Sequence, residues 1–83
     1  MRNLRIQGLE TPLLQKRVVE SWPMVAGEVT ARYTTQVTIY NQILYVKISV
    51  PALRQNLSMQ RQELVQKLNA YVGAQVIIDI HVH

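Results

Sequence analysis

The residue types best suited to metal chemistry stand near the end of the chain. His81 and His83 are two residues apart in an alternating segment, so on a strand their side chains project from one face, which Asp79 shares. Imidazole and carboxylate groups are metal ligands. The chain contains no Cys, however, and no other carboxylate lies close by in sequence. We therefore predict exposed histidines on a terminal strand and no metal site.

The acidic residues do not form a catalytic arrangement. Each of the 5 lies on a separate stretch of the sequence, so no two of them make a local pair suited to acid-base catalysis. The 3 glycines are far apart and form no phosphate-binding loop. The sequence therefore predicts a protein that is not an enzyme, and one with no cofactor and no small-molecule substrate. An enzyme would need a site that the fold assembles entirely from distant residues.

The basic residues suggest a binding function. Arg54 and Arg61 are seven residues apart on a predicted helix, hence on one face, with Gln55, Ser58 and Gln62 between them. Such groups can contact phosphate and sugar oxygens, although a solvated helix flank has the same pattern. A predicted nucleic-acid surface therefore starts from these two arginines. Four further cations would extend it if the fold brings them together: Lys16, Arg17, Arg32 and Lys47.

Composition limits the chain to one small domain. The 83 residues carry 9 Lys and Arg against 5 Asp and Glu, a formal charge of +4, which suits contact with nucleic acid but also serves solubility. A chain of this length builds a single core. Without Cys there is no disulfide framework, and no segment has the apolar run that crosses a membrane. We expect a cytoplasmic protein without membrane contact.

The first third of the chain predicts a broken helix. The pair Thr11-Pro12 favours a helix start, and apolar residues then recur at helical spacing as far as Trp22. Pro23 predicts a break or kink at Trp22, with a second short helix over residues 24–32. Trp22 would then stand at a corner. There it is either a core anchor whose indole N–H finds one acceptor or an exposed contact for a protein partner.

The middle of the chain predicts a hairpin and one long helix. Residues 33–40 and 43–50 alternate with a period of two, and the pair Asn41-Gln42 joins them in a hairpin whose turn type stays open. From Pro51 onwards the apolar residues follow a helical period until Gly73, a typical helix stop. These patterns predict two antiparallel strands followed by a single helix.

The last segment predicts a third strand and completes the fold. Residues 75–82 alternate, with Val76 and Ile78 on the apolar face and Ile77 on the opposite, outer face. The order helix, strand, strand, helix, strand predicts a two-layer α+β domain over residues 11–83, with the helices on one face of a three-stranded sheet. Residues 1–10 remain as a short arm or remnant. The pattern leaves open whether the third strand lies beside the first or the second.

Several motifs occur together between residues 9 and 82. They are VVESWPMVAG at 18–27, ARYT at 31–34, LYV at 44–46, LVQKLNAYVG at 64–73, and then Val76, Ile77 and Ile80. Their combination resembles the DciA-like family, long catalogued as a domain of unknown function, in its short single-domain form. The resemblance implies a KH-like α+β domain and a loader or operator of the bacterial replicative helicase with weak affinity for DNA.

The resemblance also implies functional residues. Trp22 and Gly27 match characteristic positions of the family and are candidates for partner binding, whereas Arg54, Arg61 and Lys67 fall on a candidate DNA-binding surface. We therefore expect a non-enzymatic, DNA-associated adaptor of the replicative helicase. The alternative is a protein-interaction module that binds no nucleic acid and whose positive charge only serves solubility.

Three features depart from the family pattern. Members usually carry a further amphipathic helix, whereas here ten residues precede Thr11, so we expect that helix to be trimmed or reduced to Asn3–Leu9. The Gly-x-x-Gly loop of true KH domains is missing, so base reading by that loop is not expected. Longer members add a disordered tail that contributes to DNA binding. This sequence ends at His83, and we expect its DNA contact to be weak.

Overall fold

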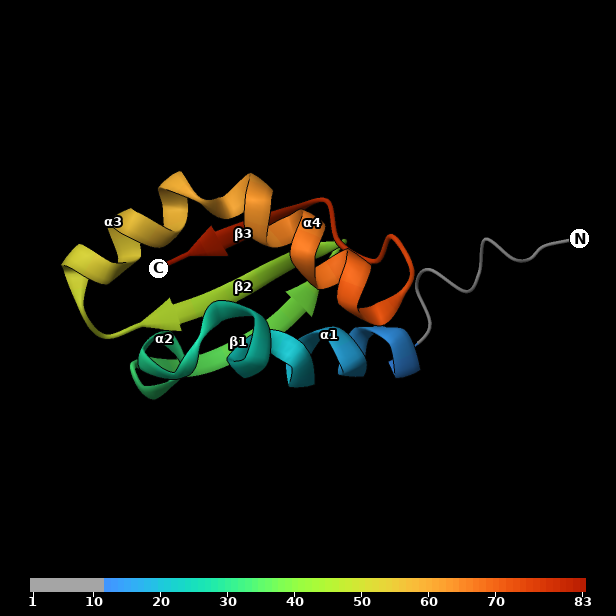
Figure 1. Ribbon diagram of the computed structural model, residues 1–83, viewed down its shortest axis with the longest axis horizontal. Coiled ribbons are helices and arrows are strands. Elements are labelled where there is room, and N and C mark those ends of the chain that lie inside the picture. Colours follow the sequence, from blue (N-terminus) through green and yellow to red (C-terminus); the bar gives the residue numbers. More distant parts are fainter. Residues whose placement is uncertain (1–11) are drawn as a thin grey trace, which may run out of the picture.

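The structure, a computed structural model, describes residues 12–83. The elements are α1 (Pro12–Ala26), α2 (Glu28–Arg32), β1 (Thr34–Tyr40), β2 (Ile43–Ile48), α3 (Pro51–Met59), α4 (Arg61–Val72) and β3 (Asp79–Val82) (Figure 1). The predicted α+β class is confirmed, because helices accompany a sheet in which β2 pairs antiparallel with β1 and parallel with β3. The third strand therefore lies beside the second. The predicted arm and the helix over Asn3–Leu9 fall outside the described residues.

Helix α1 runs through Pro23, so of the break or kink predicted at Trp22 the break is wrong, and the second helix begins at Glu28 instead of residue 24. A proline inside a helix lacks its own amide donor, but its fixed φ is compatible with the helix. The last turn is completed by the Gly27 amide, which donates to the Pro23 carbonyl at 3.1 Å. The break comes at Gly27, whose φ of 102° and ψ of 160° belong to a region essentially restricted to glycine. This residue separates α1 from α2.

The predicted hairpin is confirmed, and its turn type is now defined. Asn41 and Gln42 both have positive φ, 52° and 65°, which is the signature of a type I′ turn. This turn matches the twist of the flanking strands, and Asn tolerates the left-handed conformation well. The register places Ile39 opposite Leu44 on the inner face of the sheet.

The predicted single helix after Pro51 is wrong, because the chain bends at Gln60. Gln60 has φ −104° and ψ 11°, and its amide donates to the Leu57 carbonyl three residues earlier at 3.0 Å. The two halves have different packing partners: α3 contacts β2 and β3, whereas α4 packs mainly against α1. The bend lets Leu57 and Leu64, one on each half, both reach the core.

The third strand is shorter than predicted, and its apolar faces differ. The Asn69 side chain holds the preceding loop: its Oδ1 accepts from the amides of Val76 at 2.9 Å and Ile77 at 3.1 Å, and its Nδ2 donates to the Ile77 carbonyl at 2.9 Å. The backbone there bonds to α4 instead of extending the strand. Ile77 is therefore fully buried and Ile78 is 53% exposed, the reverse of the prediction.

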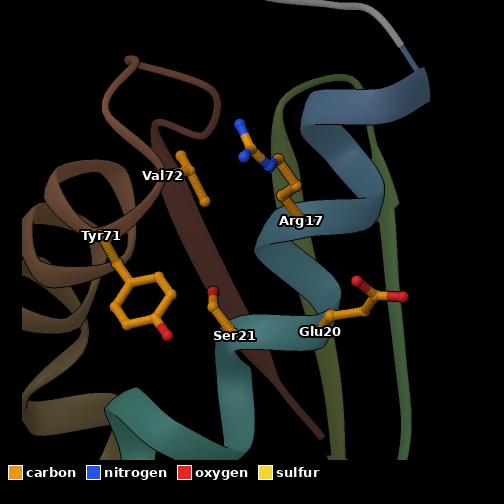
Figure 2. A pocket seen from close by; sticks show the side chains of 5 residues that line it. All are labelled: Arg17, Glu20, Ser21, Tyr71 and Val72. Carbon is orange, nitrogen blue, oxygen red and sulfur yellow. The ribbon is translucent and has the colours of Figure 1, made fainter.

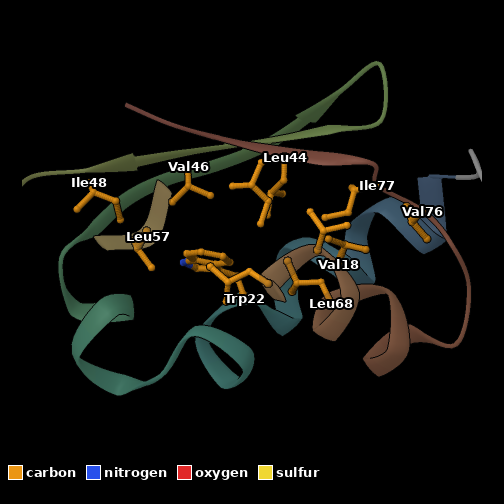
Figure 3. Close-up of a cluster of buried hydrophobic side chains, with 12 residues drawn as sticks. Val18, Trp22, Leu44, Val46, Ile48, Leu57, Leu68, Val76 and Ile77 are labelled. Carbon is orange, nitrogen blue, oxygen red and sulfur yellow. The ribbon is translucent and has the colours of Figure 1, made fainter. Parts of the chain in front are cut away.

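The core lies between the sheet and the helices. Figure 3 shows buried side chains of β2, among them Leu44 and Val46, facing Val18 and Trp22 of α1 and Leu68 of α4. In the part of the chain that the structure describes, the helices lie on this side of the sheet, as predicted (Figure 3). Each fully buried aliphatic side chain contributes about 1.5–3 kcal/mol. Packing thus fixes α1 and α4 against one face and leaves the alternate residues of the strands on the other.

Candidate interaction surfaces

Trp22 lies in the core and connects three elements. Its side chain is 1% exposed, and its Nε1–H donates to the Thr34 hydroxyl at 3.1 Å. That hydroxyl donates in turn to the Thr30 carbonyl at 2.7 Å. The geometry is that of a core anchor whose indole finds one acceptor. Trp22 is therefore covered, and it ties α1 to the start of β1 and to α2.

A groove lies between α1 and α4 and has a volume of about 280 Å³ (Figure 2). We call it the α1–α4 groove; it is lined by Arg17, Glu20, Ser21, Tyr71 and Val72. Figure 2 shows Arg17 and Glu20 on α1, with Tyr71 and Val72 on the facing end of α4. The Ser21 hydroxyl donates to a carbonyl of its own helix at 2.8 Å and is already satisfied. The groove therefore combines one cation, one carboxylate and an aromatic wall.

Exposed apolar side chains continue the α1–α4 groove. The Tyr71 hydroxyl contacts the Met24 Sδ at 3.1 Å, and the two residues are 55% and 71% exposed. A flexible methionine beside a tyrosine is typical of adaptable protein-binding surfaces. Sequence reasoning did not single out Met24, because the expected break at Pro23 left the face of this helical turn undefined. Gly27 lies between α1 and α2, so α1 ends shortly after Met24.

Four of the seven predicted nucleic-acid-binding cations lie in exposed ion pairs. Three pairs are one helical turn apart, and the fourth links α4 to β3. Exposed pairs contribute only about 0–1 kcal/mol to stability, but each reduces the local positive charge. The pairs are Lys16 with Glu20 at 4.0 Å, Arg32 with Glu28 at 3.9 Å, Lys67 with Glu63 at 3.3 Å and Arg61 with Asp79 at 3.3 Å.

The other three predicted cations have no carboxylate partner within residues 12–83. Arg17 lines the α1–α4 groove, and Lys47 projects from the opposite side of the sheet. Arg54 is partly buried, and its Nη1 donates to the Ile48 carbonyl at 2.8 Å, which secures the end of β2. Arg54 and Arg61 therefore do not form the stacked outward pair that a single helix predicts. The bend at Gln60 separates them, and each has a structural partner.

The strands expose a second surface on the side away from the helices. Buried and outward residues alternate along β2, and register adds their neighbours on β1 and β3. We call this surface the open sheet face; it includes Thr38, Tyr40, Tyr45, Lys47, His81 and His83.

The histidines of the open sheet face are arranged as neighbouring rings. The Tyr45 and His81 rings are 5.6 Å apart at 60°, and those of His81 and His83 are 5.6 Å apart at 27°. Asp79, the candidate third metal ligand, bonds to Arg61 instead. Among residues 12–83, no three His, Asp or Glu side chains converge as they would around a metal ion. Sequence reasoning placed both histidines on this face but missed Tyr45, because the partner of the third strand was open.

Comparison with known proteins adds one match. A family model described as "Dna[CI] antecedent, DciA" matches residues 1–82 of the sequence. No curated protein matches the sequence. The family match spans almost the whole chain, so it does not depend on any one motif or element. Over residues 12–83, no helix has both the length and the apolar character needed to cross a membrane.

Proposed function

Because the chain belongs to the DciA family, which is associated with loading the bacterial replicative helicase, we propose that it is a non-enzymatic adaptor between this helicase and DNA. The structural observation that supports this proposal is the presence of two different exposed surfaces on one small scaffold. One is apolar and lies among the helices, and the other carries Lys47 on the sheet. We place its action in the cytoplasm, where the bacterial chromosome is replicated.

The helicase would bind at the α1–α4 groove and its rim. Met24 and Tyr71 are exposed and in contact, and a partner that covers them removes apolar surface from water. Arg17 adds a cation without a carboxylate partner among the described residues, which suits an acidic patch on the partner. Trp22 and Gly27 act in this proposal by positioning the end of α1. A buried anchor and a glycine turn together fix where Met24 projects.

DNA would bind weakly through cations that are not already paired. All four acidic side chains of residues 12–83 lie in ion pairs, so the excess charge resides on Arg17, Lys47 and Arg54. One N–H of the Arg54 guanidinium already donates to the Ile48 carbonyl. Few phosphates can therefore be neutralised at once, which predicts modest affinity and a shallow dependence on salt.

Binding of the purified replicative helicase of the same cell tests the first half. Met24→Ser and Tyr71→Ser should each weaken binding about 10-fold, since each removes an exposed apolar contact of the size found at interface hot spots. Ile78→Ser is the matched control, because Ile78 is 53% exposed but does not line the α1–α4 groove, and its amide bonds to Gln42 of the hairpin turn. If the wild-type chain does not bind the helicase, the helicase function is refuted. If it binds and both rim variants bind equally well, the groove assignment is refuted.

A salt titration of DNA binding tests the second half. Lys47→Gln should reduce the slope of log K against log salt by about 0.7 on single-stranded DNA, because one phosphate contact is lost. Arg61→Gln should leave the slope nearly unchanged, because Asp79 already neutralises that cation. Absence of any DNA binding at low salt would leave a pure protein-interaction module. The ion pairs that cancel four of seven cations are the observation in favour of that alternative.

A further inference from the structure

Besides Tyr40, the open sheet face carries three rings and a lysine in adjacent register positions. Tyr45 on β2 stands opposite His81 on β3. The His83 amide and carbonyl bond to the residues on either side of Lys47, at 2.9 and 2.8 Å, which places His83 opposite Lys47. Outward side chains therefore form two neighbouring rows that cross the sheet: one pairs Tyr45 with His81, and the next pairs Lys47 with His83.

The rings of Tyr45, His81 and His83 lie against one another, and their polar atoms have no partner within residues 12–83. Tyr45 meets His81 edge to face at 5.6 Å, and His81 stacks on His83 at 5.6 Å and 27°. In the described part of the chain, the imidazoles of His81 and His83 and the Tyr45 hydroxyl make no hydrogen bond. His81 and His83 are exposed. Flat rings that are held in place by one another and by the sheet offer preformed stacking surfaces.

The charge beside these rings is positive, and no carboxylate among residues 12–83 neutralises it. Lys47 is exposed, and its ammonium pairs with no carboxylate among residues 12–83. Asp79, which begins β3, is neutralised by Arg61 at 3.3 Å, and its Oδ1 also accepts from the Ile80 amide at 2.8 Å. The face therefore combines aromatic rings with an unpaired cation, the two features that bind bases and phosphates together.

We infer that the open sheet face binds single-stranded DNA by stacking its bases on Tyr45 and His81, with Lys47 at a phosphate. The inference rests on the proposed DNA association and adds the strandedness and the surface. A duplex hides the faces of its bases, so only an unpaired strand can stack on these rings. Tyr45 and His81 lie opposite each other on neighbouring strands, with ring centroids 5.6 Å apart, so a flexible single strand of DNA can set successive bases on these two rings.

The two histidines provide a direct reporter of this contact. The sequence contains 2 His, so their imidazole proton signals are easily resolved by NMR in the untagged full chain. Addition of a dT oligomer of about 12 nucleotides at low salt should shift both signals, because the ring current of a stacked base changes the chemical shifts of nearby imidazole protons. A duplex of equal length should leave them in place. Equal shifts with duplex and single strand would overturn base stacking.

Substitutions then separate rings from charge. Tyr45→Thr and His81→Thr keep strand propensity and should each weaken oligomer binding roughly 5-fold or more with an unchanged salt slope. Tyr45→Phe and His81→Tyr keep a ring and should bind within about 2-fold of the wild type. Tyr33→Thr is the matched control, because Tyr33 is 40% exposed at the C-cap of α2, before β1 begins. Circular dichroism confirms that each variant is folded.

The outcomes distinguish this inference from the proposed function. If the wild type binds DNA but both ring-deleting variants bind as tightly, the DNA lies elsewhere, and only the surface assignment is lost. If the wild type binds no DNA, both the inference and the DNA half of the proposed function are refuted. If the ring-deleting variants instead abolish self-association seen by sedimentation, a second copy occupies the face and the inference is overturned.

Discussion

At the scale of single residues, Trp22 has the largest structural role. Its ring fills the space between α1 and the sheet, and its N–H begins a chain of two hydrogen bonds that ends at Thr30. Trp22→Ala should lower the free energy of unfolding by about 3–5 kcal/mol, a large part of the about 5–15 kcal/mol of a typical domain. Urea unfolding followed by far-UV circular dichroism measures the loss.

A conservative change at the same position separates packing from hydrogen bonding. Trp22→Phe keeps an aromatic ring but removes the N–H that Thr34 accepts, so it should cost clearly less than the alanine variant. Full stability of Trp22→Ala, together with lost helicase binding, would contradict the core role and make Trp22 an interface residue.

Asn69 controls the loop before β3 with one side chain. It makes three hydrogen bonds to the backbone of Val76 and Ile77. Asn69→Ala leaves these partly buried backbone groups without partners and should destabilise the domain by about 2–4 kcal/mol. Asn56→Ala is the matched control, because Asn56 is exposed on α3 and its side chain bonds to nothing within residues 12–83. Equal urea midpoints for the two variants would refute this role of Asn69.

At the scale of elements, Gly27 sets the direction in which the chain leaves α1. Its φ of 102° is strained for any other residue, although an added Cβ would meet nothing within 4 Å. Gly27→Asn should therefore cost about 1–3 kcal/mol through the backbone alone. Gly73→Asn should cost less, because Gly73 is in the αL region that Asn tolerates. Thermal unfolding compares the pair, and an equal loss would contradict the argument.

The elements also show which parts of the fold the sequence predicts. The hairpin and the two-layer arrangement follow from a period of two and from amphipathic spacing, which local residues determine. No Gly or Pro marks the bend at Gln60 in the sequence. The bend arises from the different packing partners of α3 and α4. Ile77 points into the core because the Asn69 side chain on α4 hydrogen-bonds to the backbone of the loop that contains Ile77. Such long-range bonds leave no periodic trace in the sequence.

The candidate sites follow the same division. The residue types were visible in the sequence, and the two histidines were placed on one outward face from alternation alone. That Tyr45 is their neighbour follows from the pairing of β3 with β2, and alternation alone does not predict which strands pair. The pairing of cations with acids was likewise hidden for Arg61, whose partner Asp79 is distant in sequence. Spacing predicts the contacts within an element, and topology decides those between elements.

At the scale of the whole molecule, the two candidate surfaces lie on opposite sides of the sheet. The α1–α4 groove is built in the helical layer, and the open sheet face points away from it (Figure 3). The core between them belongs to neither surface. One ligand can therefore bind each side without contacting the other, which is the geometry that an adaptor needs.

This arrangement predicts that helicase and single-stranded DNA bind at the same time. With the chain captured on immobilised helicase, the affinity for a dT oligomer should stay within about 2-fold of that of the free chain, because coupling is weak between surfaces without shared residues. The double variant Tyr71→Ser with Tyr45→Thr should show each single loss unchanged, one in helicase binding and one in DNA binding. Competition between the two ligands would mean that they share a surface, and the two-sided arrangement would then be wrong.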